Sequence, residues 1–287
     1  MFDKFLIFSC MTNISILILT LDEEANLTEC LASCAWCDDI VVFDSHSTDR
    51  TVEIALAKGA RVELRQFDNY AAQRNAALHS IQYRHNWVLM LDADERIPAA
   101  LAEEIQHVIA KAAESTTLFR VRRKDHFFGR WLRRSSGYPT WFGRLVRPER
   151  VRVEREINEE FVTDGGIELL QQHLEHYPFS KGIAWWYERH NRYSSMEALA
   201  TLTERNKPVQ WSALLRSDPV LRRRSLKQLA YRLPARPLIV FLYLYVVRRG
   251  LLDGLPGLYY STMRASYELM IDIKVRELRT RENQQPV

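Results

Sequence analysis

Strand-like and helix-like segments alternate along the N-terminal part of the chain, and this alternation constrains the fold more than any other feature. Short, mostly apolar segments predict strands at Ile14–Thr20, Asp39–Ser45, Arg61–Gln66 and Trp87–Leu91. Strands that alternate with helices are joined by right-handed crossovers and lie parallel in one sheet. The sequence therefore predicts an α/β fold in which helices flank a mostly parallel sheet.

Four helices are predicted to connect or follow these strands. They extend over Glu24–Ala35, from the Ser47-Thr48-Asp49 cluster to Lys58, over Tyr70–Ser80, and over Pro98–Ala113. Serine, threonine and aspartate are preferred caps at a helix N-terminus, and proline is favoured in the first turn. These start signals support the predicted second and fourth helices.

Acidic side chains stand at the ends of two predicted strands. In "WVLMLDADERI", Asp92 and Asp94 follow the fourth strand, and Asp44 ends the second. The carboxyl ends of parallel strands meet at one edge of the sheet, where open α/β folds bind ligands. Carboxylate oxygens at such an edge suit a hard divalent cation that also holds a phosphate. The alternative is a solvated strand end, or acids that cap the helix beginning at Pro98.

Composition and charge describe a globular chain with an uneven charge distribution. Of its 287 residues 47% are hydrophobic and 26% are charged, which is typical of folded proteins. The net charge is only +4, but Arg120–Arg155 and Arg216–Arg249 are rich in arginine. Such a basic second half suits nucleic acid, an anionic membrane surface or phosphorylated substrates.

The cysteines and the N-terminus indicate a cytoplasmic protein. Cys30 and Cys34 share the apolar face of the first predicted helix, so core packing is expected; Cys34 and Cys37 form a C-x-x-C pair, but no second pair follows at zinc-site spacing. The N-terminal segment lacks the cleavage site of a signal peptide. No apolar run reaches the roughly 18 residues that a spanning helix needs.

The second half of the chain has a different pattern. "LFRVRRKDHFFGRWLRR" predicts an edge strand followed by a loop, and "FGRLVRPERVRVE" predicts a β-ribbon that turns at Pro148-Glu149. A helical region begins at Lys181. Within it, "PLIVFLYLYVV" (Pro237–Val247) is too short to cross a bilayer and is flanked by arginines, as in helices that lie at a membrane interface. A helix buried against the α/β domain is the competing interpretation.

The order of these motifs resembles the inverting glycosyltransferases of family 2, which have the Rossmann-like GT-A fold. The similarity is greatest to the branch that builds bacterial lipopolysaccharide core and exopolysaccharide. It extends from Ile14 to about Lys274 and is carried by "ILTLDEEANL", "IVVFDSHSTDRT", "NYAAQRNAAL", "WVLMLDADER", "FGRLVRPE", "INEEF", "LEHYPF", "RHNRYSSMEA" and "GLLDGLPGLYYS".

The resemblance implies a reaction and a domain organisation. A nucleotide-sugar, with UDP as the expected nucleotide, would donate a sugar to a saccharide or lipid-linked acceptor with the help of Mg²⁺ or Mn²⁺. Residues 12–180 would form the GT-A domain that binds the nucleotide-sugar and carries out catalysis. Residues 181–287 would form a helical region for acceptor binding and peripheral attachment to the inner face of the cytoplasmic membrane.

The resemblance also assigns roles to individual side chains. Asp94 is expected to bind the metal directly, Asp92 to contact the ribose or the metal through water, and His176 to supply a further metal or diphosphate contact. The residues expected at the nucleotide and its diphosphate are Thr20, Glu23, Asp44, Arg74, Arg189 and Arg192. Arginine suits this task because its guanidinium can donate two parallel hydrogen bonds to a phosphate. For Glu23 the alternative is an acid that caps the first helix. For Arg74, Arg189 and Arg192 the alternative is an arginine on a solvated helix face.

Inversion by direct displacement needs a general base on the face opposite the leaving group. Many members of this branch have a His-Glu pair for this purpose, and this sequence has "INEEF" at the matching position. Glu159 occupies the glutamate position and is the first candidate base; Glu160 is the second. Asn158 stands where the histidine is usual, so the orienting role of that histidine is not carried over. An exposed acidic turn is the alternative interpretation.

Two other function classes are weighed against this one. A nucleotidyltransferase acting on sugar phosphates usually has a glycine-rich phosphate loop after the first strand, but "LTLDEEANL" contains no glycine. A non-catalytic nucleic-acid-binding protein would use the arginine-rich half, but the acidic edge of the sheet would repel phosphates. The expected partners are therefore a nucleotide-sugar, an acceptor and a membrane surface, without nucleic acid.

Overall fold

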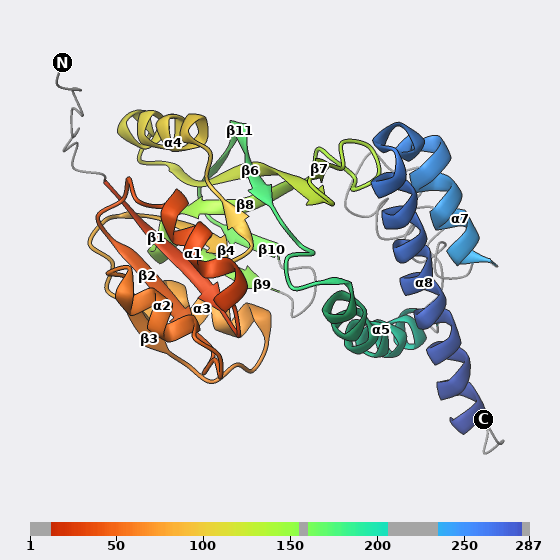
Figure 1. Ribbon diagram of the computed structural model, residues 1–287. Helices are drawn as coiled ribbons and strands as arrows, with labels where there is room; N and C mark the ends of the chain where they lie inside the picture. Colours follow the sequence, from red (N-terminus) through yellow and green to blue (C-terminus); the bar gives the residue numbers. More distant parts are fainter. Residues whose placement is uncertain (1–12, 155–159, 206–234, 283–287) are drawn as a thin grey trace. The chain divides into compact units, whose positions relative to one another are not determined.

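The computed structural model describes residues 13–154, 160–205 and 235–282 and divides into two compact units (Figure 1). The first unit extends to Asp125 and resumes over Pro139–Ser180. The second comprises His126–Tyr138 and the chain from Lys181 onward. The sequence had assigned His126–Tyr138 to the first domain, whereas the structure groups this segment with the C-terminal helices.

Four parallel strands form one half of the main sheet in the order β3-β2-β1-β4. They are β1 (Ile14–Thr20), β2 (Ile40–Asp44), β3 (Arg61–Leu64) and β4 (Trp87–Asp92). The central strands β1 and β4 are buried on both faces, which explains their unbroken apolar sequences. The predicted α/β class and the predicted strands are confirmed.

The other half of the sheet continues from β4 in the order β8-β6-β11-β5. These strands are β8 (Trp141–Val146), β6 (Thr116–Phe127), β11 (Gly166–His176) and the short β5 (Glu95–Arg96). β8 runs antiparallel to both β4 and β6, and β11 runs parallel to β6. The prediction that this segment forms an edge strand is therefore wrong, because β6 lies between β8 and β11.

The predicted ribbon with a turn at Pro148-Glu149 is also wrong. A 3-10 turn, η1 (Pro148–Arg150), follows β8, and the chain then leaves the main sheet. The next strand, β9 (Val151–Glu154), pairs with β10 (Glu160–Thr163) as a separate two-stranded ribbon. The strand-like sequence was recognised, but its pairing partner is a later segment of the chain.

Helices flank the parallel half of the sheet as predicted (Figure 1). They are α1 (Glu24–Ser33), α2 (Thr51–Ala57), α3 (Tyr70–Ser80) and α4 (Ala99–Lys111). The Asn69 side chain caps α3 by accepting a hydrogen bond from the amide of Ala72 at 2.8 Å. Cys30, Cys34 and Cys37 are free thiols buried in the core, which confirms the packing role predicted for Cys30 and Cys34.

The second unit is helical. Besides the short strand β7 (Arg130–Trp131), its described elements are α5 (Ile183–Arg205), α7 (Arg236–Leu242), a π-helical turn η3 (Tyr243–Val247), a 3-10 turn η4 (Gly250–Asp253) and α8 (Leu255–Glu282). Both α5 and α7 pack against α8. The buried Asp253 accepts hydrogen bonds from the amides of Arg134 and Ser135, and so fixes the 126–138 segment within this unit. None of the described helices is long and apolar enough to cross a membrane.

Candidate active site at the carboxyl ends of the parallel strands

The carboxyl ends of β1, β2 and β4 meet at one edge of the sheet. Thr20 at the end of β1 is the register partner of Asp44 at the end of β2. On the other side of β1, Leu19 is the partner of Asp92 at the end of β4. The expected convergence of acidic strand ends is therefore confirmed, and this edge is the candidate site.

Asp44 is fully buried and held by its neighbours. The Thr20 hydroxyl donates to Oδ2 of Asp44 at 2.7 Å, and Ser47 donates its amide to Oδ1 at 2.8 Å and its hydroxyl to Oδ2 at 2.5 Å. A carboxylate can accept about four hydrogen bonds, so Asp44 keeps capacity for one more donor. Its contact with a nucleotide, like that of Thr20, stays a prediction.

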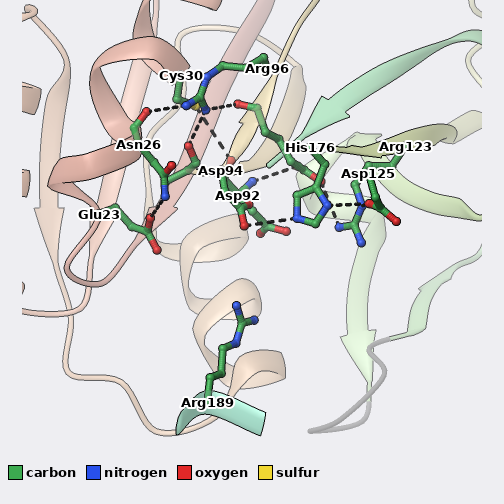
Figure 2. Close-up of polar contacts among 12 residues, drawn as sticks. Glu23, Asn26, Cys30, Asp92, Asp94, Arg96, Arg123, Asp125, His176 and Arg189 are labelled. Carbon is green, nitrogen blue, oxygen red and sulfur yellow. Dashed lines mark hydrogen bonds and ion pairs between the residues drawn. The ribbon is translucent and has the colours of Figure 1, made fainter. Parts of the chain in front are cut away.

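Glu23 stands at the N-terminus of α1 in the first β–α loop. Its amide donates to the Thr51 hydroxyl at 2.7 Å, and its carboxylate accepts from the side-chain amide of Asn26 at 2.7 Å (Figure 2). The carboxylate makes no capping hydrogen bond to the helix backbone. Glu23 is thus fixed at the same edge of the sheet, and its contact with a nucleobase stays a prediction.

Asp92 forms ion pairs with two arginines. Arg74 of α3 donates to Oδ1 at 2.9 Å, and Arg144 of β8 donates to Oδ2 at 2.6 Å. Burial alone would raise the pKa of Asp92, but Arg144, Arg74 and Arg123 together hold this pKa well below its usual range. Arg74 is buried in this ion pair and does not lie on a solvated helix face. Asp92 is therefore a fixed carboxylate in an arginine clamp.

Glu95 is fully buried one turn beyond Asp92 and uses both carboxylate oxygens. Oε1 accepts from Arg144 at 2.8 Å and lies 3.4 Å from Nη1 of Arg123, and Oε2 accepts from the amide of Asp92 at 3.1 Å. Burial lowers the pKa of Arg144, but Asp92 and Glu95 outweigh it and raise this pKa above its usual value. Glu95 thus joins the strand end to the buried Arg144 and the half-buried Arg123.

His176, the last residue of β11, lies between two carboxylates (Figure 2). Its Nε2 is 3.2 Å from Oδ2 of Asp94, and its Nδ1 is 2.7 Å from Oδ1 of Asp125. Burial and Arg123 lower the pKa of His176, but Asp94 and Asp125 overcome both and raise it to about 9. Burial raises the pKa of Asp94, but His176 outweighs it and lowers this pKa to about 2. The structure therefore brings two of the predicted metal ligands together.

Asp94 and His176 have the chemistry of a divalent cation site. A partly exposed carboxylate and an imidazole whose second nitrogen faces another carboxylate are a recurrent ligand pair. Mg²⁺ and Mn²⁺ are commonly bound through one or two protein side chains, with phosphate oxygens and water completing the shell. Among the described residues no cluster of three or more such ligands occurs. The pair therefore fits a cation that arrives with a phosphate.

The β9–β10 ribbon is fixed next to the arginine clamp. Asn75 of α3 makes two hydrogen bonds of 2.8 Å with the backbone of Val153 in β9. Phe161 of β10 packs on Gly143 of β8, where any Cβ would lie 2.9 Å from the phenylalanine ring. Gly143 directly precedes Arg144, so the beginning of β10 lies close to the clamp.

The two candidate bases precede or begin β10. Glu160 is its first residue and is exposed. Glu159, the first candidate, lies outside the described residues. The catalytic roles of both glutamates stay predictions.

The two arginines predicted to clamp the diphosphate belong to α5 in the second unit. Arg189 lies over the ring of Trp185 at 5.1 Å and donates its Nε proton to the Tyr193 hydroxyl at 2.8 Å. Arg192 is exposed. Their contacts with a diphosphate stay predictions.

Several residues of the site were not predicted from the sequence. Glu95 was read only as part of the "DADE" motif, and the residues missed entirely are Asn75, Arg123, Asp125 and Arg144. A signal existed for Arg123 and Asp125, because residues two apart in a strand share one face of the sheet. We interpreted the alternation of apolar and basic residues in this segment as an edge strand followed by a loop.

Comparison with known proteins agrees with this architecture. The profile described as "Glycosyl transferase family 2" matches residues 15–175. An uncharacterized glycosyltransferase of Rickettsia prowazekii is 25% identical over 280 residues, which cover 93% of this chain and 88% of that protein. The lipopolysaccharide core biosynthesis glycosyltransferase LpsC of Rhizobium meliloti is 30% identical over 161 residues, 54% of this chain and 58% of that protein.

Other similarities cover shorter regions. An uncharacterized glycosyltransferase of Rickettsia typhi is 36% identical over 101 residues, so that this chain spans only 34% of its length. Among solved structures, glucosyl-3-phosphoglycerate synthase from Mycobacterium tuberculosis, in complex with Mn²⁺, UDP and glucosyl-3-phosphoglycerate, is 22% identical with a TM-score of 0.33. That alignment covers 40% of this chain and 44% of the synthase. Because the family profile matches more than half of the chain, the protein belongs to glycosyl transferase family 2.

Proposed function

We propose that the protein is a metal-dependent inverting glycosyltransferase of lipopolysaccharide core or exopolysaccharide biosynthesis. It moves a sugar from a nucleotide-sugar, with UDP as the nucleotide, to a saccharide or lipid-linked acceptor. The observation that carries the proposal is the Asp94–His176 pair at the edge of the parallel sheet, beside the clamped Asp92. The similarity to LpsC supports the choice of pathway.

The leaving group of this reaction is a nucleoside diphosphate, and its negative charge grows as the bond to the sugar breaks. A divalent cation, when bound, neutralises that charge, which is worth several kcal/mol of transition-state stabilisation. Asp94 and His176 are the residues that would hold the cation. Asp44, Glu23 and Asp92 would orient the nucleoside, because all three are fixed at the same edge of the sheet.

The acceptor hydroxyl attacks the anomeric carbon from the face opposite the diphosphate. A new carbon–oxygen bond forms, the bond to the phosphate oxygen breaks, and the hydroxyl proton passes to a carboxylate. Glu159 is the proposed base and Glu160 the alternative. The fixed position of the β9–β10 ribbon supports this choice, since Phe161 packs on the residue next to Arg144.

A donor screen with the purified full chain tests the function. Thermal stability and donor hydrolysis are measured with UDP-, ADP- and GDP-sugars, each with and without Mn²⁺. We expect one nucleotide-sugar to stabilise and be hydrolysed by the protein only when the metal is present. Formation of a nucleotide-sugar from a sugar phosphate and a nucleoside triphosphate would instead identify a nucleotidyltransferase, and stabilisation by RNA alone would identify a nucleic-acid-binding protein.

Replacing the proposed base has an expected kinetic signature. Glu159→Gln should lower kcat by about 100- to 10,000-fold, because the attacking hydroxyl loses its proton acceptor. Donor affinity should change little, since the base does not bind the nucleotide. Glu160→Gln, at the alternative base, should retain most of its activity, and the reverse pattern of losses would identify Glu160 as the base. Equal activity of Glu159→Gln and the unaltered enzyme would show that another group takes the proton.

Peripheral attachment to the membrane is part of the proposal, and the exposure of α7 and η3 supports it. None of the residues in these two elements is buried. The exposed apolar side chains are Leu238, Ile239, Leu242, Tyr243, Val246 and Val247. Arg248 and the exposed Arg249 follow directly, and basic residues beside an apolar helix face favour anionic lipid headgroups. This exposure favours an interfacial helix over a buried one.

Vesicle binding checks this attachment. The full chain should sediment with vesicles that contain anionic lipid at low salt, and high salt should release much of it, because the headgroup attraction is screened. Val247→Glu, at a side chain 70% exposed, should reduce binding by about tenfold or more. Ile273→Glu on α8, at a residue 56% exposed, is the control and should bind normally. A full chain that stays in the supernatant at low salt would rule out the attachment.

A further inference from the structure

Asp125 occupies a specific place behind the candidate cation site. It lies near the end of β6, and His176 is its register partner on the parallel neighbour β11. The Asp125 carboxylate is 2.7 Å from Nδ1 of His176, whereas Asp94 is 3.2 Å from Nε2. The two carboxylates therefore face the two different nitrogens of one imidazole, and sheet pairing fixes the position of the inner one.

Arg123 pairs with the same oxygen of Asp125 that faces His176. Its Nε lies 3.2 Å from Oδ1 of Asp125, and its Nη1 lies 3.4 Å from Oε1 of Glu95. The guanidinium also lies over the ring of Phe142 at 4.3 Å, which limits its movement. Glu95 in turn accepts a hydrogen bond from the backbone amide of Asp92. Arg123 and Glu95 therefore connect Asp125, behind His176, to the arginine clamp around Asp92.

The chemistry of histidine gives this arrangement a consequence. A neutral imidazole carries its proton on one nitrogen and can bind a metal only with the other. A carboxylate that accepts the Nδ1 proton therefore fixes the ring orientation and leaves the Nε2 lone pair for the metal. Such outer carboxylates typically contribute 10- to 100-fold to metal affinity.

We propose that Asp125 is a positioning residue that fixes the orientation and tautomer of His176, so that Nε2 is presented to the divalent cation beside Asp94. This inference rests on the proposed metal-dependent function. Asp125 acts through His176 and contacts neither the cation nor the sugar donor. Arg123, whose Nε lies 3.2 Å from Oδ1 of Asp125, holds the carboxylate in place.

The test measures cation affinity directly. Mn²⁺ binding to the purified full chain is followed by electron paramagnetic resonance at saturating UDP, for the unaltered protein and for Asp125→Ala, Asp125→Asn and His176→Ala. Asp125→Ala should weaken Mn²⁺ binding by about 10- to 100-fold. Asp125→Asn should lose less Mn²⁺ affinity than Asp125→Ala, because its amide oxygen still accepts a hydrogen bond from Nδ1. It should still lose some affinity, because the amide carries no charge.

Glu175→Gln is the matched control. Glu175 precedes His176 on β11, but its carboxylate lies 3.4 Å from Lys124 and 3.2 Å from His173. This variant should bind Mn²⁺ within about twofold of the unaltered protein, which corresponds to at most a few tenths of a kcal/mol. Thermal melting of each variant separates loss of the cation from loss of the fold, and Asp125→Asn, nearly equal in size, preserves the packing if the alanine variant melts early.

The possible outcomes distinguish the inference from the function on which it rests. If folded Asp125→Ala and Asp125→Asn bind Mn²⁺ like the unaltered protein while His176→Ala does not, the positioning role is wrong and the cation site stands. If His176→Ala and an Asp94→Ala variant both keep full Mn²⁺ affinity, the proposed cation site itself is wrong. Graded loss in the order Asn, then Ala, at position 125 supports the inference.

Discussion

Asp94→Asn should lower kcat for sugar transfer by about 100- to 1,000-fold, or about 3–4 kcal/mol of transition-state stabilisation. The substitution keeps the size of the side chain but removes the charge that would hold the cation against the leaving diphosphate. The fold should persist, because His176 keeps its contact with Asp125. Steady-state kinetics with the donor identified in the screen, over a range of Mn²⁺ concentrations, is the measurement.

A surface aspartate provides the control for this result. Asp164 has a side chain that is 72% exposed and pairs with Arg150 at 3.0 Å. Asp164→Asn should therefore retain full activity, since exposed ion pairs contribute little. Activity of Asp94→Asn above about a tenth of the unaltered enzyme, far beyond the expected range, would contradict the assignment of Asp94 as a metal ligand.

Arg144→Met should cost about 3–5 kcal/mol of unfolding free energy, the largest stability effect expected for a polar residue of the site. The Arg144 side chain is only 4% exposed and donates to both Asp92 and Glu95. Among the described residues, its loss leaves the more distant Arg123 as the arginine partner of Glu95 and Arg74 as that of Asp92. Unpaired charge in a buried environment is strongly destabilising. Urea denaturation followed by circular dichroism measures the change.

Arg150→Met is the matched substitution for this experiment. Arg150 pairs with the exposed Asp164, and its own side chain is 35% exposed, so the expected loss is below about 1 kcal/mol. Removing one of the stranded charges should recover part of the loss, so Arg144→Met combined with Glu95→Gln should be more stable than Arg144→Met alone. If the free energy of unfolding of Arg144→Met lies within about 1 kcal/mol of that of the unaltered protein, the arginine clamp does not stabilise the fold.

The parallel half of the sheet could be predicted because its sequence signals are local. β1 and β4 are buried on both faces, and such strands are unbroken apolar segments whatever their neighbours are. The predicted start signals also lie at the observed helix starts, since Asp49 accepts a hydrogen bond from the amide of Thr51 at the start of α2, and α4 begins directly after Pro98. The convergence of the acids at the ends of β2 and β4 then follows from the strand direction alone, and so the candidate site was predicted with the fold.

The antiparallel half and the inner part of the site could not be predicted in the same way, because they depend on pairing between distant segments. β8 inserts between β4 and β6, and only this insertion places Arg144 against Asp92. The pairing of β6 with β11 likewise brings Asp125 to His176. A charged residue in a strand is usually exposed. Arg144 is buried here and Arg123 half-buried, and their acidic partners Asp92 and Glu95 come from other strands.

The most direct test of the proposed function is a crystal structure of the full chain with UDP and Mn²⁺. The proposal predicts a manganese ion bound by Asp94 and His176, with the diphosphate on the same ion and the nucleoside over the ends of β1 and β2. A nucleotide bound elsewhere on the protein, with Asp94 and His176 still in contact with each other and without metal, would contradict it.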